Sequence, residues 1–265
     1  MEKSTTVLQN HLGLVETGLN TSWHTDSLGD GDGTARVGNL SQSWLSGTLQ
    51  RAKTTFARHM TEEGEHNGHW SLLQQKGYDI NPCKSKLHPA VRSEGLEPEE
   101  GEEMCVQEAY TPDSVCFGCG PSAPDGLKLQ SYRIEDGLEA RVSIDPKFCA
   151  FPGIVNGGIV ATLFDCHGNW TAAVTLMDRG CLPQPPLTTV AEILIKYEEP
   201  TPPNEELLLR SHVVNVEETG GVGSKATVHV ELTLLQKVQH MGQGGEVTIA
   251  SGTGIFKKLG ALRAL

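Results

Sequence analysis

The chain has 265 residues, enough for one large domain or for a domain with an extension. Its formal charge of −12 argues against a nucleic-acid-binding surface, which usually shows clustered lysine and arginine. No apolar run approaches the roughly 18 residues of a membrane-spanning helix. The seven cysteines are an odd, scattered set, which fits reduced thiols in an intracellular protein better than a disulfide framework.

The first 110 residues have the composition of an extension rather than of a folded domain. They are rich in Gly, Ser, Thr, His and Asn, and their apolar residues show no lasting periodicity. The stretch from Glu94 to Glu103 carries six glutamates and no basic residue, which is typical of a solvated linker. We therefore expect a mostly disordered extension or linker over residues 1–110 and a folded domain over residues 111–260.

One segment of this extension has a different character. Between Gly33 and Thr61 there is no acidic residue, basic residues are present, and the apolar residues fall on one helical stripe. Such a segment is similar to an organelle transit peptide, although a transit peptide should begin at the N-terminus. The alternative is a solvated or docking helix. Since Met1 is followed by Glu2 and Lys3 rather than by an apolar stretch, we expect a cytoplasmic protein, with a mitochondrion or a plastid as the alternative.

From about Thr111 the sequence indicates short strands separated by turns. The stretch GLKLQSYRIEDGLEARVSI reads as two strands joined at Glu135–Gly137, a good hairpin signal. Four further strands are predicted later in the chain, with Gly, Pro and Asn at their connections: TTVAEILIKYEEP, ELLLRSHVVNVEE, SKATVHVELTLLQ and EVTIASGTGIFKK.

Between the hairpin and these strands lies FPGIVNGGIVATLFDCHGNWTAA, from Phe151 to Ala173, which is apolar almost throughout. A helix that is hydrophobic nearly all round is a buried helix. The pattern therefore predicts an α+β domain in which a curved antiparallel β-sheet wraps around one long buried α-helix.

Asn156, Gly157 and Gly158 mark the start of this helix. Asn is among the best N-cap residues, because its side chain accepts a hydrogen bond from a backbone N–H that has no partner within the helix. Two glycines leave the N–H groups of the first turn sterically open, and the helix dipole favours negative charge there. The site either only caps the helix or also polarises a carbonyl group, as an oxyanion hole does.

Asp165 is the only acidic residue between Pro152 and Met177. A buried carboxylate is costly unless it is neutralised or paired, and no cation lies within one helical turn of it. A pairing with a more distant Lys or Arg or with the backbone is one possibility. A general base or a nucleophile is the interpretation that we favour.

Two other motifs suggest chemistry but favour structural roles. Cys166 and His167 adjoin Asp165, yet neighbours on a helix point about 100° apart, so we expect a buried Cys and a hydrogen-bonded His. Cys116 and Cys119 form a CxxC, which is half of a zinc site, and no second CxxC or HxxxH follows at a usable spacing. We therefore expect a tight turn here, no metal ion and no cofactor. The glycines of ETGGVGSK lack the Gly-Lys-Ser/Thr order of a phosphate-binding loop and indicate a hairpin turn.

Three stretches resemble the hotdog-fold thioesterases of the phenylacetic-acid-degradation type: CFGCGPSAPDGLKL, FPGIVNGGIVATLFD and a strand ending in YEEPTP. The resemblance covers about residues 112–258. It implies a long helix wrapped by an antiparallel sheet, a homodimer or homotetramer that pairs edge strands, and the hydrolysis of acyl-CoA to free acid and CoA.

The resemblance also implies roles for individual residues. Asp165 would activate water or act as the nucleophile, and the N–H groups of Gly157 and Gly158 would polarise the thioester carbonyl. Thr188 and Thr189 lie near the place where the family often has a substrate-binding hydroxyl. The clear departure is Asn156, where the family usually has His; Asn keeps its hydrogen-bonding capacity but cannot carry a proton.

Two other functions compete with thioester hydrolysis. A hydratase or dehydratase of the same fold would need a His just before a Phe-Pro-Gly-like turn, and this chain has Ala150 before Phe151. A non-catalytic protein that binds acyl thioesters or has a regulatory role is the alternative from a different class, and Asn156 is its best support. We expect an acyl-CoA thioesterase without a nucleic-acid partner or a membrane span.

Overall fold

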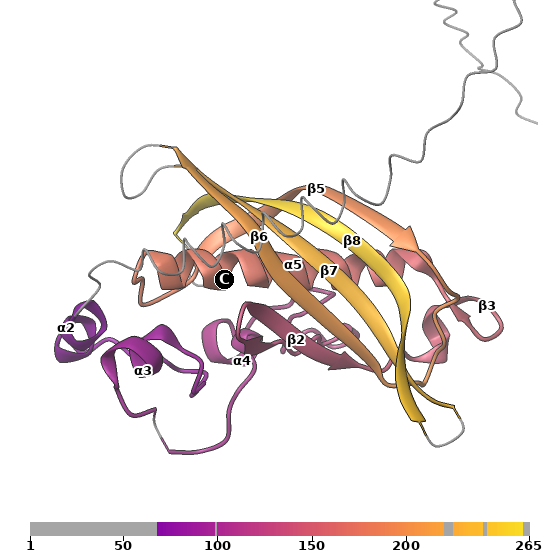
Figure 1. Cartoon of the computed structure of the whole chain (residues 1–265), viewed down its shortest axis with the longest axis horizontal. Coiled ribbons are helices and arrows are strands. Elements are labelled where there is room, and N and C mark those ends of the chain that lie inside the picture. The colour runs from indigo at the N-terminus through magenta and orange to yellow at the C-terminus, as the bar shows by residue number, and fades with distance from the viewer. Residues whose placement is uncertain (1–67, 99, 220–224, 241–242, 262–265) are drawn as a thin grey trace, which may run out of the picture. The chain divides into compact units, whose positions relative to one another are not determined.

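The computed structural model describes residues 68–98, 100–219, 225–240 and 243–261. The segment Gly33–Thr61, interpreted above as a transit peptide or a docking helix, lies outside these residues, and so does most of the glycine-rich turn. The described chain is dominated by one antiparallel sheet that curves around one long helix, as the sequence predicts (Figure 1). This is the hotdog arrangement.

The long helix α5 spans Gly157–Arg179 and comprises 23 residues. It begins directly after the predicted cap, Asn156, and it is followed by Gly180. Its buried side chains are mostly apolar and include Val160, Leu163, Phe164, Trp170, Val174 and Met177. Among the described residues, no helix is both long enough and apolar enough to cross a membrane. The apolar surface of α5 is instead buried against the sheet.

The sheet has the strand order β1-β2-β6-β7-β8-β5, and all its pairings are antiparallel. The predicted hairpin is confirmed: β1 (Tyr132–Ile134) and β2 (Gly137–Val142) are joined by a two-residue turn, with Ile134 opposite Gly137. The four predicted later strands are confirmed as well: β5 (Pro186–Tyr197), β6 (Leu207–Thr219), β7 (Lys225–His240) and β8 (Gln243–Ala261).

The face of the sheet towards α5 is set by alternation along the strands. On β7 every second residue is buried: Ala226, Val228, Val230, Leu232 and Leu234. Side chains of a strand alternate between the two faces, so these five residues share one face and pack into the core with α5. Their neighbours Glu231 and Thr233 belong to the opposite face.

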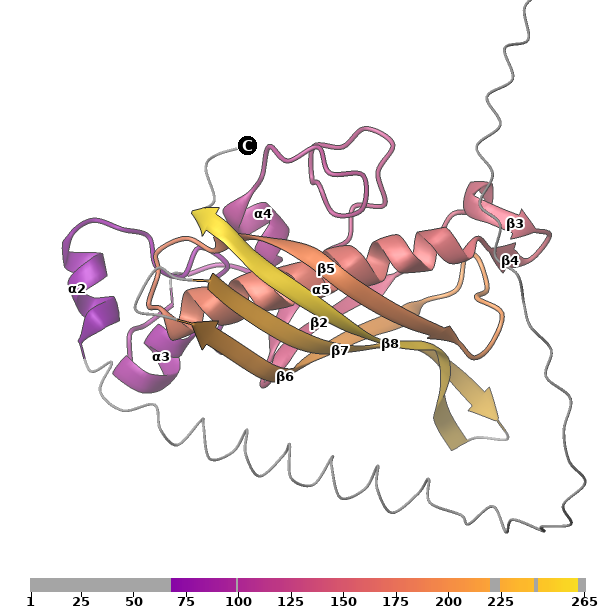
Figure 2. The same ribbon diagram turned by 90° about the horizontal axis from the view of Figure 1, so that it is seen from above.

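The curvature of the sheet has local causes. The pairing of β5 with β8 shifts register twice, between Leu187 and Thr188 and between Val190 and Glu192. Such bulges bend a strand and increase its twist, which lets the sheet follow the helix (Figure 2). The helix also permits a close approach, because Gly168 has no side chain where the ring of Phe256 on β8 packs against it.

A short segment delivers the chain to the start of α5. It consists of a 3-10 turn (Pro146–Phe148) followed by the small hairpin of β3 (Cys149–Phe151) and β4 (Ile154–Val155). This hairpin lies outside the main sheet, beside the beginning of α5 (Figure 2).

The stretch before Thr111 contains more structure than its composition suggests. It forms α2 (His69–Gln75), α3 (Pro89–Glu94) and α4 (Val106–Tyr110). A second apolar cluster joins Trp70, Ile80, Ala90 and Cys181, and α4 contributes Val106 and Tyr110 to the main core. Helices of five to seven residues are too short to show a periodicity, so composition alone favoured a linker. The boundary at residues 110/111 stays a prediction.

A buried ion pair links β1 to the end of α5. Arg133 donates two hydrogen bonds to the carboxylate of Asp178, at 2.6 Å and 2.9 Å. Near it lies His88, fully buried, whose Nδ1 accepts a hydrogen bond from the N–H of Ala90 and caps α3. The ring of His88 also meets the indole of Trp70 edge-on at 4.9 Å.

The pKa of His88 is lowered to about 4, mainly by burial and then by the positive charge of Arg133, while Asp178 opposes the change. In the unfolded chain a histidine has a pKa of about 6.5. At a pH between these two pKa values, the unfolded chain therefore binds a proton that the folded chain does not. His88 consequently makes the native state less stable as the pH falls below about 6.5.

We predict that the free energy of unfolding of the full chain decreases between pH 6.5 and pH 5, and that His88 accounts for up to about 3 kcal/mol of the loss by pH 4. His88→Asn keeps a capping acceptor but cannot take up a proton. The free energy of unfolding of this variant should therefore depend less on pH in this range, whether or not the substitution changes stability at neutral pH. Urea denaturation at a series of pH values measures the slope. An unchanged slope in His88→Asn would contradict the assignment.

Candidate functional site

The start of α5 is held by contacts from three segments. The N–H of Asn156 donates to the carbonyl of Phe148 at 2.9 Å, and the N–H of Val155 donates to the carbonyl of Thr201 at 3.0 Å. The hydroxyl of Tyr197, at the end of β5, donates to the carbonyl of Gly157 at 2.8 Å. The YEEPTP stretch therefore fixes the position of the helix start.

The predicted cap is confirmed and has a consequence for the neighbouring N–H groups. The Asn156 side chain accepts a hydrogen bond from the N–H of Gly158 at 2.7 Å, and the Asn156 carbonyl accepts one from the N–H of Ile159 at 2.9 Å. In the described part of the chain, the N–H of Gly157 has no acceptor. One of the two glycine N–H groups expected to polarise a carbonyl is thus engaged by the cap, and the other is free.

Asp165 lies two turns further along α5 and is half-buried. Its carboxylate makes no hydrogen bond or ion pair with any residue that the structure describes. Partial burial raises the pKa of the Asp165 carboxyl, and negative charge at Cys116 adds to the rise. A carboxylate that has neither a partner nor full solvation is a better proton acceptor than an exposed one.

Asp165 and the helix start are far apart within one chain. Eight residues separate Gly157 from Asp165, which corresponds to about 12 Å along the axis at 1.5 Å per residue. A reacting carbon has to lie about 3 Å from both the attacking group and the oxyanion donors. The two groups of one chain are therefore too far apart to act on the same carbonyl.

The structure gives Thr188 and Thr189 different environments. Thr188 is buried, and its hydroxyl donates to the carbonyl of Asn169 at 3.2 Å, so it is engaged with the α5 backbone. Thr189 is exposed on β5. Together with the contact between Tyr197 and Gly157, the Thr188 bond shows that β5 runs beside α5 in the opposite direction.

Asn169 was not identified from the sequence. It lies one helical turn after Asp165, so both side chains leave α5 on the same side. Its Oδ1 atom is buried and has no hydrogen-bond partner among the described residues. A buried acceptor beside an unpaired carboxylate is unusual, since most buried polar atoms are hydrogen-bonded. The sequence did offer one indication of its role, because a residue four positions after Asp165 lies on the same side of the helix.

His167 is structural, as predicted. It is fully buried, its Nε2 lies 3.0 Å from the carbonyl of Leu138, and its Nδ1 lies 2.8 Å from the hydroxyl of Ser131. Since a carbonyl only accepts, Nε2 carries the proton and Nδ1 accepts from Ser131. Burial lowers the pKa of His167 to about 4, which keeps the ring neutral.

The CxxC turn brings two thiols to α5. The Sγ atoms of Cys116, Cys119 and Cys166 all lie within 4.8 Å of one another, and those of Cys116 and Cys166 are 3.8 Å apart. The hydrogen bond with Cys166 lowers the pKa of the Cys116 thiol, and the backbone N–H groups of Cys119 and Gly118 lower it further. The sequence did not reveal this cluster, because the third cysteine comes from the helix.

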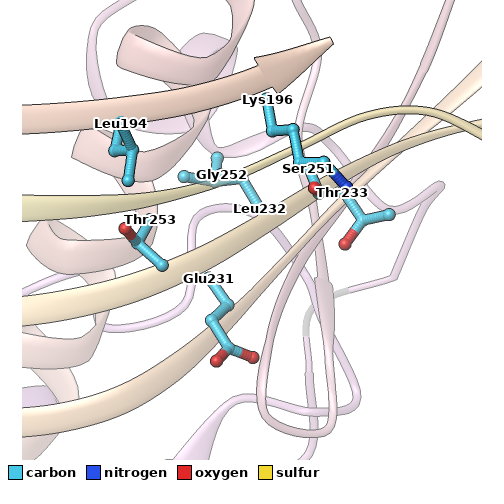
Figure 3. A pocket seen from close by; sticks show the side chains of 8 residues that line it. All are labelled: Leu194, Lys196, Glu231, Leu232, Thr233, Ser251, Gly252 and Thr253. Atoms are coloured by element: carbon cyan, nitrogen blue, oxygen red, sulfur yellow. The ribbon is translucent and has the colours of Figure 1, made fainter. Parts of the chain in front are cut away.

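A shallow groove of about 310 Å³ lies on the sheet face opposite α5 (Figure 3). It follows two rows of cross-strand neighbours, Leu194–Thr253–Glu231 and Lys196–Ser251–Thr233. These side chains project away from the helix. The groove is therefore separate from Asp165 and from the helix start.

No family model and no curated protein matches the chain. Solved structures do show similarity. A thioesterase superfamily protein from Shewanella loihica is 25% identical and has a TM-score of 0.38, over 57% of this chain and 96% of that one. A Streptococcus mutans protein bound to acetyl CoA is 17% identical with a TM-score of 0.37, over 51% of this chain and 91% of that one.

The E. coli PaaI protein from the phenylacetic acid degradation operon is also similar, at 14% identity and a TM-score of 0.37 over 51% of this chain and 82% of that one. Because these TM-scores lie below 0.5, the strand order and the enclosed helix establish the fold, and the environment of Asp165 is the basis for assigning a function.

Proposed function

We propose that the chain hydrolyses acyl thioesters, with acyl-CoA as the substrate class, and that Asp165 is the general base. The observation that carries this proposal is the half-buried carboxylate of Asp165, which has no partner among the described residues and a raised pKa. A structural carboxylate at such a position would have a cation or several N–H donors around it. Asp165 has neither, which supports a catalytic role.

The proposed reaction combines Asp165 of one protomer with the helix start of a second protomer in a homodimer. Asp165 takes a proton from a water molecule, and the water oxygen attacks the thioester carbon. The N–H of Gly157, at the positive end of the α5 dipole, donates to the oxygen that becomes negative. The carbon–sulfur bond then breaks, the protonated Asp165 returns its proton to the departing sulfur, and the free acid and the thiol remain.

Asn156 can take part without carrying a proton. Its Oδ1 is used by the cap, which leaves the Nδ2 hydrogens as donors beside the N–H of Gly157. Asn156 is exposed, so a substrate oxygen can reach both groups. The same cap occupies the Gly158 N–H, and we therefore assign the carbonyl to Gly157 and Asn156. Thr188 is engaged with α5, and Thr189 follows it on the opposite face of the sheet, so we assign neither threonine to the substrate.

CoA is the leaving group that we propose, and two of the similar solved structures contain a coenzyme A thioester. The Streptococcus mutans protein holds acetyl CoA, and an acyl-CoA hydrolase from Staphylococcus aureus is in complex with butyryl coenzyme A. The alternative is a protein that binds acyl thioesters without hydrolysing them. A purified chain that binds acyl-CoA but does not turn it over would support that alternative.

The proposal includes a homodimer that forms through β5. The described sheet has two edges: β1, with three residues, and β5, with twelve. A long edge strand offers a row of unpaired backbone groups and is normally covered or paired. Leu194 on β5 is 67% exposed, which adds apolar surface to this edge.

Pairing two β5 strands around a two-fold axis would also complete the site. The axis reverses the direction of the partner's α5, so the partner's helix start approaches the third turn of this helix, where Asp165 lies. This arrangement removes the difficulty that Asp165 and Gly157 of one chain are about 12 Å apart along the helix. Each site would then combine Asp165 of one protomer with the helix start of the other.

Asp165→Asn should reduce turnover of acyl-CoA by about 10²–10⁴-fold, because Asn cannot accept a proton from water. The melting temperature should hold or rise, since an unpaired carboxylate is removed. Steady-state hydrolysis over a panel of CoA thioesters from acetyl to palmitoyl, together with aryl-acetyl, measures the first effect, and thermal denaturation measures the second.

Asn156→Ala is the contrasting variant, because it removes the cap and one proposed donor to the carbonyl but leaves the base in place. It should cost about 1 kcal/mol of stability and cause a smaller loss of rate. Retention by Asp165→Asn of more than about a tenth of the wild-type rate would rule out the general-base role.

Ala191→Pro should weaken the dimer. Ala191 lies in the β5 bulge and has no partner on β8. Proline is tolerated at bulges and on edge strands, and at this position it removes an N–H and adds a ring to the strand that a second copy would pair with. Light scattering at micromolar concentration should show a dimer or a dimer of dimers for the wild type and a smaller species for Ala191→Pro.

Ala191→Gly keeps the N–H and is the control, and circular dichroism verifies that both variants fold. A wild-type monomer, or a folded Ala191→Pro variant as fully associated as Ala191→Gly, would argue against pairing through β5.

A further inference from the structure

Three cysteines that are distant in sequence meet beside Asp165. Cys116 and Cys119 come from the turn between α4 and β1, and Cys166 comes from α5. Among the residues that the structure describes, they form the one group of three or more His, Cys, Asp or Glu side chains whose ligand atoms lie within 4.8 Å of one another.

The distance between two of the sulfur atoms equals the distance expected between two sulfur ligands of one zinc ion. Zinc binds a thiolate at about 2.3 Å, and two corners of a regular tetrahedron of that radius are about 3.8 Å apart. The Sγ atoms of Cys116 and Cys166 are 3.8 Å apart. A disulfide would need about 2.05 Å, so a shift of more than 1.5 Å would be required to join them.

The CxxC turn approaches α5 closely. Gly118 lies between the two cysteines of the CxxC, and a side chain at this position would collide with Cys166 Sγ and with the methyl group of Thr162. The N–H of Gly120 donates to the carbonyl of Cys116 at 2.8 Å and closes the turn. A glycine at residue 118 therefore lets the turn place its thiols against α5.

The three thiols differ in their exposure to solvent. A metal ion binds the thiolate form of cysteine. Cys116 is exposed, which gives an ion a path into the cluster, whereas Cys119 and Cys166 are buried.

We infer that Cys116, Cys119 and Cys166 form a binding site for a thiophilic divalent metal ion, with zinc as the ion that fits best. Three sulfur ligands exclude magnesium and calcium, which prefer oxygen. The fourth ligand would be solvent, which can reach the cluster at the exposed Cys116. This site goes beyond the proposed hydrolysis, which needs no metal ion.

A bound ion would join the CxxC turn to α5 at the residue next to Asp165. The cluster would then hold the turn that carries Phe117, whose ring meets the ring of Phe148 edge-on at 6.2 Å beside the helix start. The metal site therefore has a positioning role for one side of the candidate active site. Its binding can be measured without any substrate.

The test uses the full chain, reduced and freed of metal with a chelator. Titration with Zn²⁺ against a chromophoric competitor should give one tight site per chain. Titration with Co²⁺ should give thiolate-to-cobalt charge-transfer absorption and the intense visible bands of tetrahedral coordination. Zinc should also raise the melting temperature, because an ion that binds only the native state stabilises it.

Cys116→Ser, Cys119→Ser and Cys166→Ser should each weaken binding at least about tenfold and abolish the thiolate-to-cobalt absorption of the complete site. Cys149→Ser is the matched control, because Cys149 is a free, half-buried thiol outside the cluster, and it should bind as the wild type does. Circular dichroism verifies that each variant folds.

Three results would overturn the inference. These are the absence of a one-to-one site in the reduced wild type, binding that survives all three cluster substitutions, and a disulfide between Cys116 and Cys166 found by mass spectrometry in protein purified without oxidant. The proposed hydrolysis needs no metal ion, so the metal site and the proposed function can fail separately.

Discussion

The structure depends on the need to bury α5. A helix of 23 residues whose side chains are apolar on nearly every side is unstable in water, so another layer has to enclose it. The long strands of the sheet provide that layer, and the bulges in β5 give it the curvature to follow the helix. The energetic gain comes from apolar area removed from water, and the alternating residues of β7 supply much of the opposing surface.

Enclosure by one sheet leaves α5 incompletely covered, and this incompleteness explains the candidate site. Asp165 and Asn169 leave the helix on the same side, and the backbone carbonyl of Asn169 accepts a hydrogen bond from Thr188 of β5, the long edge strand. There a carboxylate can be half-buried without being paired, which an enclosed position would not allow. The same edge is where a second copy of the chain would pair. Site and proposed interface therefore follow from one feature of the fold.

Much of the fold could be predicted because its signals are local. Asn156 before two glycines and a long apolar run fixed the start of α5, and Glu135–Gly137 fixed the hairpin. The later strands carry enough β-branched residues and turn signals to be located, although they extend further than predicted. The position of Asp165 within the apolar run is the feature of the sequence on which the site prediction rests.

The features that the sequence did not reveal depend on contacts between distant segments. The helices α2 to α4 are too short for periodicity, and only packing against the end of α5 shows that Trp70 is part of a core. The third thiol of the cysteine cluster follows Cys119 by 47 positions, so no ligand spacing could indicate it. The engagement of Thr188 with Asn169 likewise requires the register of β5 against the helix.

The central claim is that each site combines Asp165 of one protomer with the helix start of its partner. Mixed dimers test it most directly. Gly157→Pro removes the donor N–H at the first helical position, where proline is well tolerated, and Asp165→Asn removes the base. Homodimers of either variant should be nearly inactive, but co-refolding the two should restore hydrolysis, because each mixed dimer regains one site with both groups intact. Activity that stays at the level of the separate variants, in mixtures shown to contain mixed dimers, would contradict the account.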